Sequence, residues 1–341
     1  MTALTHDLAV FTAALLVSLA VTRLAIPLGL RLGIVARPGG RRQHHGVVSR
    51  LGGLGIAAGF FAGLMVDRLA PLPTADPLES TRLTGLALGA LWMFLLGLAD
   101  DRFELRPWQQ YLGYLVAAGI AARFSIILER FNNPLGEGMI VLAAWLYLPL
   151  TLFWFTGMTV TVNWLDGLDG LAAGVSAILA LILAAHMAHV GQQSVVPQAL
   201  ALAGAAIGFL RYNVPPARLF MGSSGSFTLG YLLAALGLIA GARVATVLMV
   251  MGLPILDVAM TIGERLSAGA PLTQGDRRHL HFRLQDAGLR TWQIVLAYWS
   301  LCALFGLLAL TLPTRLYKLL ALGVAAIIAA GMLAYASRRS R

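Results

Sequence analysis

The sequence is poor in charged residues and almost lacks cysteine. Charged residues make up 12% of its 341 residues and hydrophobic residues 58%, with a mean hydropathy of +0.79. A soluble domain of this size needs more polar surface than this composition supplies, so a multi-pass membrane protein is expected. The single cysteine, Cys302, stands in an apolar run, which excludes an internal disulfide and indicates a buried thiol.

Acidic residues are also scarce. The chain has 15 Asp and Glu residues against 25 Lys and Arg residues, a net charge of +10. Such a charge can indicate a nucleic-acid partner, but in so apolar a chain the basic residues are typical of cytoplasmic loops that face anionic lipid. No nucleic-acid partner is expected.

Long apolar runs dominate the chain. A bilayer core of about 30 Å requires roughly 20 apolar residues per helix, and about eleven runs approach this length. No convincing cleavage site follows the first run, so this run is expected to remain as a span. The predicted fold is a single all-α membrane domain over residues 1–341, with the N-terminus outside and the C-terminus in the cytoplasm. The first nine runs cover about residues 9–28, 51–65, 83–98, 108–128, 139–155, 171–189, 199–210, 227–240 and 244–261.

Five polar segments separate these runs in pairs. Because two spans lie between each segment and the next, all five are expected on one side of the membrane, and their arginines make that side cytoplasmic. One cytoplasmic surface would then carry the chemistry. The segments cover about residues 31–50, 100–107, 157–170, 211–226 and 263–291. The first contains the basic residues Arg31, Arg37, Arg41, Arg42, His44, His45 and Arg50.

The stretch T-V-T-V-N-W-L-D-G-L-D-G-L, residues 159–171, carries Asn163, Asp166 and Asp169 at steps of three. A continuous helix would place all three on one face, whereas the glycine after each aspartate predicts a helix end or a broken turn. Carboxylates between long apolar segments are unfavourable unless they bind a cation or a polar ligand. The alternative is that Asp166 caps the following helix in an ordinary loop.

Asp100 and Asp101 end the third apolar run. A carboxylate at the C-terminal end of a helix meets the negative end of the helix dipole, so a compensating cation is expected. Pairing with Arg102 or Arg106 is one solution. The other is Mg²⁺, which a few carboxylates hold and substrate phosphates complete, and the acids of residues 159–171 favour it.

Residues 276–284 read D-R-R-H-L-H-F-R-L, and their imidazole and guanidinium groups suit a phosphate or a diphosphate. A zinc site is a rival interpretation, but no cysteine is near and two histidines are too few for a closed site. A solvated loop is the remaining alternative. The residues concerned are Arg277, Arg278, His279, His281 and Arg283.

Six motifs together resemble one enzyme superfamily. They are R-L-G-G at 50–53, L-A-D-D-R at 98–102, N-W-L-D-G-L-D-G-L at 163–171, F-M-G-S-S-G-S at 220–226, L-P-I-L-D at 253–257 and D-R-R-H-L-H-F-R-L at 276–284. In these motifs and their order the chain is similar to the polyprenyl-phosphate N-acetylhexosamine-1-phosphate transferases (glycosyltransferase family 4), which include phospho-N-acetylmuramoyl-pentapeptide transferase. The H-x-H form of the last motif is more similar to the branch that uses UDP-GlcNAc than to the peptidoglycan branch.

This resemblance implies an enzyme of the bacterial inner membrane. A polyprenyl phosphate such as undecaprenyl phosphate would attack a UDP-N-acetylhexosamine and release UMP, with Mg²⁺ as the cofactor and Mn²⁺ as an alternative. Phe220 would stack on uracil, and Asp100 or Asp101 would accept a proton or help to hold metal. The resemblance implies catalytic roles for Asp100, Asp101, Asp166, Asp169, His279 and His281, substrate contacts for Arg50, Asn163, Phe220, Arg277, Arg278 and Arg283, and metal ligation by Asn163, Ser223 and Asp101.

Three residues depart from the family's pattern. Ser223 stands where the family usually has a metal-binding aspartate, Val160 where an asparagine is common, and Phe282 where a third histidine is common. A serine hydroxyl can bind Mg²⁺ but brings no charge, so weaker or rearranged metal binding is expected, with an inactive homologue as an alternative. An ion-coupled transporter is a further alternative, although transporters place their acids near the midplane in repeated halves. Small-residue spacings such as Gly85 to Gly89 leave a homodimer open.

Overall fold

The computed structural model describes residues 2–36, 46–74, 76–133, 136, 138–239, 241, 244–271 and 277–339. Its α-helices are α1 (Ala3–Leu32), α2 (Gly52–Leu69), α3 (Glu79–Phe103), α4 (Pro107–Arg123), α5 (Ala144–Leu165), α6 (Leu171–His189), α7 (Val196–Asn213), α8 (Gly222–Ile239), α9 (Val244–Val250), α10 (Gly252–Ser267), α11 (Leu280–Asp286), α12 (Thr291–Thr311) and α13 (Arg315–Arg339). A 3₁₀ turn, η1, covers Gln193–Val195. Two short antiparallel ladders pair β1 (Val35–Ala36) with β2 (Val48–Ser49), and β3 (Arg130–Asn132) with β4 (Met139–Val141).

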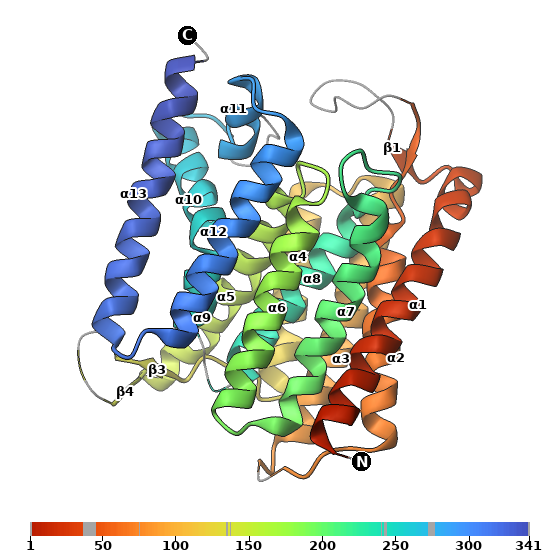
Figure 1. The fold of residues 1–341 in the computed structure, drawn as a ribbon, viewed down its shortest axis with the longest axis vertical. Coiled ribbons are helices and arrows are strands. Elements are labelled where there is room, and N and C mark those ends of the chain that lie inside the picture. Colours follow the sequence, from red (N-terminus) through yellow and green to blue (C-terminus); the bar gives the residue numbers. More distant parts are fainter. Residues whose placement is uncertain are drawn as a thin grey trace.

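The all-α, multi-pass architecture is confirmed (Figure 1). Within the described residues, nine helices are long and apolar enough to cross a membrane, and a tenth span is formed if α9 and α10, bent by 78°, count as one. The remaining predicted span, the fourth, over about residues 108–128, corresponds to α4, whose 17 residues make a helix of roughly 25 Å, slightly shorter than a bilayer core. The number of spans and the orientation of the termini therefore stay predictions.

Helix α8 lies at the centre of the bundle. All of its residues are buried, and it packs against α2, α3 and α5. At the periphery, α1 and α13 instead expose large apolar side chains such as Leu16 and Ile327, as expected of surfaces that face lipid acyl chains. The N-terminus of α8 is therefore held by its neighbours on every side, and this end of the helix organises the polar residues described below.

The polar segments meet at one end of the bundle, the end at which β1 and α11 lie in Figure 1. There the backbone N–H of Phe220 donates to the carbonyl of Ser49 at 2.9 Å, and that of Gly52 donates to the carbonyl of Phe220 at 3.0 Å. The N-terminus lies at the opposite end. That the polar end faces the cytoplasm stays a prediction. Several residues of these segments fall outside the described residues, namely Arg37, Arg41, Arg42, His44, His45 and Asp276.

Candidate active site

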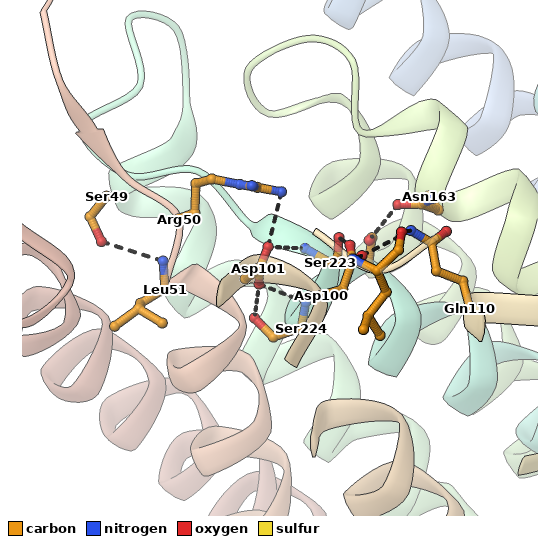
Figure 2. A network of polar contacts seen from close by, with 11 residues as sticks. Ser49, Arg50, Leu51, Asp100, Asp101, Gln110, Asn163, Ser223 and Ser224 are labelled. Atoms are coloured by element: carbon orange, nitrogen blue, oxygen red, sulfur yellow. Dashed lines mark hydrogen bonds and ion pairs between the residues drawn. The ribbon is translucent and has the colours of Figure 1, made fainter. Parts of the chain in front are cut away.

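Asp101 accepts hydrogen bonds from the N-terminus of α8 (Figure 2). Its Oδ1 accepts the backbone N–H of Ser223 at 2.8 Å, and its Oδ2 accepts the N–H and the hydroxyl of Ser224 at 2.9 and 2.8 Å. The guanidinium of Arg50 lies 3.1 Å from Oδ1. A helix N-terminus favours an anion because its first N–H groups have no partners within the helix. The cation beside Asp101 is therefore Arg50, rather than Arg102 or Arg106, and each carboxylate oxygen already has two donors.

A glycine makes this junction possible. Gly222 has φ +70°, and a Cβ atom there would lie 2.5 Å from Oδ2 of Asp101, too close for any side chain. The glycine of the F-M-G-S-S-G-S motif is thus required by the approach of α3 to the first turn of α8.

Asp100 has a different surrounding. Its Oδ1 accepts the backbone N–H of Leu105 at 3.0 Å and the side-chain amide of Gln110 at 2.9 Å. Its Oδ2 accepts the hydroxyl of Ser223 and no other donor within the described residues. Ser223 and Asp100 therefore form a pair in which the serine oxygen and Oδ2 of the carboxylate both retain lone pairs for a further partner.

The stretch after α5 is a helix end followed by a broken turn, as predicted. Helix α5 ends at Leu165, so only Asn163 of its three polar residues is helical, and its Oδ1 accepts the hydroxyl of Ser226 on α8 at 3.0 Å. Asp169 accepts the backbone N–H of Ala217 at 2.9 Å and so holds the loop before α8. The alternative in which Asp166 caps the next helix is wrong, because the residue at the N-cap of α6 is Gly170.

Asp166 is the acid of this site that has no hydrogen-bond partner among the described residues. Within the described residues its carboxylate forms no hydrogen bond and no ion pair, although the side chain is only partly accessible. Burial raises the pKa of Asp166 well above its ordinary value, the nearby charges of Asp101 and Asp169 raise it further, and Arg50 opposes them. An unpaired acid beside two others is a place where a cation would be stabilised.

The donor set fits Mg²⁺ better than a metal enclosed by protein. In the described part of the chain no three His, Cys, Asp or Glu residues lie close enough to hold a metal by themselves. Mg²⁺ instead accepts one or two carboxylates and completes its shell with water and phosphate oxygens. Asp166 and the Asp100–Ser223 pair offer oxygens of this kind.

A second cluster surrounds Asp257 of α10. Its Oδ1 accepts the backbone N–H of Leu280 at 2.7 Å, which caps α11, and its Oδ2 lies 3.2 Å from Nδ1 of His279 and 3.6 Å from Nδ1 of His281. The His281 ring is fully buried, and neither of its nitrogens has a hydrogen-bond partner among the described residues. Its Nε2 packs against Gly167, where any Cβ atom would collide with it. The H-x-H motif and the aspartate-rich stretch are therefore in contact.

Three members of this cluster were not among the predicted site residues. Trp164 makes an edge-to-face contact with the ring of His279, at 5.1 Å between centroids, and the buried guanidinium of Arg265 lies 5.0 Å from the Trp164 ring. Asp257 is the third. Asp257 ends the L-P-I-L-D motif, which was a usable signal, whereas nothing in the sequence connects Arg265 with Trp164 across a hundred residues of chain.

The remaining predicted residues hold loops together. Arg277 pairs with Asp286 at 2.6 Å, and Arg283 pairs with Glu264 and donates to the carbonyl of Arg278 at 2.5 Å. The half-buried Phe220 has its backbone fixed between Ser49 and Gly52, as described above. Their substrate contacts stay predictions, because none of these interactions tests them.

The buried imidazole of His281 predicts a pH-dependent stability. Burial lowers the pKa of His281 below its ordinary 6.5, with Asp257 acting in the opposite direction, so the folded state favours the neutral ring. The unfolded state then binds the proton more readily, and we expect the melting temperature in detergent to fall as the pH drops below about 6.5. His281→Gln should remove this part of the dependence, whereas the exposed His189→Gln should keep it. An equal dependence in both variants would contradict the assignment.

Comparison with known proteins identifies the family. The sequence model described as "Glycosyl transferase family 4" matches residues 83–241. A Bacillus subtilis protein named "Probable undecaprenyl-phosphate N-acetylglucosaminyl 1-phosphate transferase" is 30% identical over 310 residues, which are 89% of this chain and 84% of the relative. The chain belongs to glycosyl transferase family 4. The family predicted from the motifs is confirmed, and the transporter alternative is left without support.

Other relatives of this family 4 chain carry two kinds of name. "Decaprenyl-phosphate N-acetylglucosaminephosphotransferase" of Mycobacterium tuberculosis is 32% identical over 295 residues, 79% of this chain and 73% of the relative. "Phospho-N-acetylmuramoyl-pentapeptide-transferase" of Moorella thermoacetica is 34% identical over 277 residues, 75% of this chain and 82% of the relative. Percentage identity therefore does not separate the two branches.

Proposed function

We propose that this family 4 protein transfers N-acetylglucosamine 1-phosphate from UDP-GlcNAc to a polyprenyl phosphate such as undecaprenyl phosphate, with release of UMP. The names of the Bacillus and Mycobacterium relatives support the acceptor and the sugar, and the H-x-H motif favours this branch. The reaction would occur at the polar end of the bundle, on the cytoplasmic face of the inner membrane, where UDP-sugars are available.

The observation that carries the proposal is the carboxylate of Asp166, which has no hydrogen-bond partner among the described residues and lies within the electrostatic influence of Asp101 and Asp169. Transfer of a phosphoryl group between two anionic substrates depends on positioning and on neutralising charge. When bound, Mg²⁺ would neutralise the phosphates, held by Asp166 and by the free lone pairs of the Asp100–Ser223 pair. Asp100, whose Oδ2 retains a lone pair beside the Ser223 hydroxyl, would accept a proton from the lipid phosphate.

The other residues position these groups. Arg50 and the first turn of α8 hold Asp101, which keeps Ser223 in place beside Asp100. Asp257 orients the ring of His279. This ring packs against Trp164, which belongs to the same stretch as Asp166. We propose that His279 contacts the diphosphate or the sugar there, whereas the predicted contact by His281 is not supported, because its ring is fully buried against Gly167.

The test is release of UMP by the purified protein with undecaprenyl phosphate, comparing UDP-GlcNAc with UDP-MurNAc-pentapeptide, each with Mg²⁺ and with a chelator. Release with UDP-GlcNAc that requires both lipid and Mg²⁺ is the expected result. Release with the pentapeptide substrate alone would assign the protein to the peptidoglycan branch. No release from either donor, by protein with a cooperative melting transition, would indicate an inactive homologue.

Ser223→Asp should strengthen metal binding. The new carboxylate would face Asp100, the present partner of the serine hydroxyl, and an added negative charge at this distance attracts a divalent cation. We expect the Mg²⁺ concentration for half-maximal UMP release to fall about tenfold or more. Ser223→Asn, which changes size without charge, is the matched control and should not lower it. An unchanged Mg²⁺ dependence in Ser223→Asp would remove Ser223 from the metal site.

A further inference from the structure

A groove of about 630 Å³ lies between α1 and α7, and no residue of the candidate active site lines it. Two arginines, Arg23 of α1 and Arg211 of the last turn of α7, lie on its wall together with Tyr212. Both arginines are exposed, and within the described residues their side chains form neither ion pairs nor hydrogen bonds. Two like charges thus share one groove, and the described residues that line it include no acid.

Arg23 lies unusually far from the end of its helix for a charged residue in a membrane span. Arg23 stands nine residues before Leu32, the end of α1, which places its Cα roughly 14 Å from that end. Charged side chains this far within a spanning helix are rare and mark functional positions unless they reach the lipid headgroups. Arg23 shares its groove with Arg211 of the last turn of α7, which lies at the polar end of the bundle, and its long stem would let the guanidinium group reach headgroup level from there.

The rest of the groove is apolar. Leu16, Leu19 and Leu24 of α1 line it, and Leu16 and Leu24 are 58% and 66% exposed. A free phosphate ion would leave this apolar surface uncovered, whereas a lipid would cover it with its acyl chains. Tyr212, an aromatic residue with a hydroxyl donor, is typical of the interface between headgroups and chains.

We propose that this groove binds an anionic phospholipid, with its phosphate between Arg23 and Arg211 and its acyl chains along α1. Charge complementarity identifies the occupant, because guanidinium groups bind phosphate with paired hydrogen bonds. A second copy of this chain is a poor occupant, since a two-fold contact here would bring four arginines together. The proposal does not depend on the proposed transferase function.

The groove is connected to the loop before α8. The carbonyl of Tyr212 accepts the backbone N–H of Arg218 at 2.8 Å. The side chain of Asn213 accepts the N–H of Gly170 at 2.9 Å and donates to the carbonyl of Leu219 at 2.9 Å. A lipid held by Arg211 therefore stabilises the segment that fixes residues 214–220, and bound lipid should raise the melting temperature.

The experiment measures lipid binding by native mass spectrometry of the purified protein in neutral detergent, titrated with phosphatidylglycerol or with phosphatidylcholine. We expect the wild-type protein to bind one phosphatidylglycerol in preference to phosphatidylcholine. The double variant Arg23→Gln/Arg211→Gln should bind phosphatidylglycerol roughly 30-fold more weakly, because each arginine near anionic lipid contributes about a factor of five. The double lysine variant, which keeps both charges, should retain most of the affinity.

Arg31→Gln is the matched control, since it removes one charge from the last turn of the same helix without touching the groove. Equal binding of phosphatidylglycerol by the double glutamine variant and by the wild type would overturn the proposal. Displacement of phosphatidylglycerol by an equimolar amount of undecaprenyl phosphate would also overturn it, by assigning the groove to the lipid substrate. Melting curves of all variants establish that each is folded.

Discussion

Replacing Asp166 with asparagine is expected to reduce UMP release by about 10²–10³-fold or more, the usual effect of removing one electrostatic stabiliser of a transition state. The carboxylate has no hydrogen-bond or ion-pair partner within the described residues, so its oxygens are available to a cation that accompanies the substrate. The same variant should melt at the same or a higher temperature without Mg²⁺, because a charge unfavourable in the folded protein has been removed. Loss of activity without loss of stability is the diagnostic combination.

Asp76→Asn serves as the control for Asp166→Asn. Asp76 is paired with Arg82 in the loop between α2 and α3, so the variant removes an acid outside the site. It should leave UMP release unchanged. Activity of Asp166→Asn within a few-fold of the wild type, with unchanged Mg²⁺ dependence, would rule out the assigned role of Asp166.

Replacing Asp101 with asparagine should reduce the stability of the protein, unlike the replacement of Asp166. Removing one member of a buried ion pair leaves an uncompensated charge, here Arg50, and also replaces one of the two oxygens that accept the N–H groups of Ser223 and Ser224 by an amide donor. We expect the free energy of unfolding to fall by about 3 kcal/mol, with a clear drop in melting temperature. Activity should be lost as well, because Ser223 is then no longer held beside Asp100.

A double-mutant cycle tests this role. If Arg50 and Asp101 form one unit, Arg50→Gln combined with Asp101→Asn should lose less stability than the sum of the two single variants. A variant Asp101→Asn that is as stable as the wild type but inactive would instead give Asp101 the chemical role that the motif resemblance implies. The adjacent residues Asp100 and Asp101 would then act together on the substrates.

Much of the membrane architecture could be predicted from the sequence. Apolar runs of nearly 20 residues are read from local composition, so an all-α membrane protein with polar residues at span ends could be predicted residue by residue. The span count was less secure, since α4 is short and α9 and α10 are bent at their junction. The hydrophobicity of a segment shows that it can span a membrane, but it does not show whether the helix bends, as it does between α9 and α10.

The sequence by itself determined the family, the membrane architecture and the presence of acids, histidines and arginines suited to phosphate chemistry. Only the tertiary structure decided which acid is bound by protein donors and which has none among the described residues. Asp101 is occupied because Ser223, 122 residues later, turns its N–H towards it, whereas Asp166 finds no such donor. Hydrogen bonds form between groups that packing brings within about 3 Å, and the contact between α3 and the start of α8 joins segments that no local pattern connects.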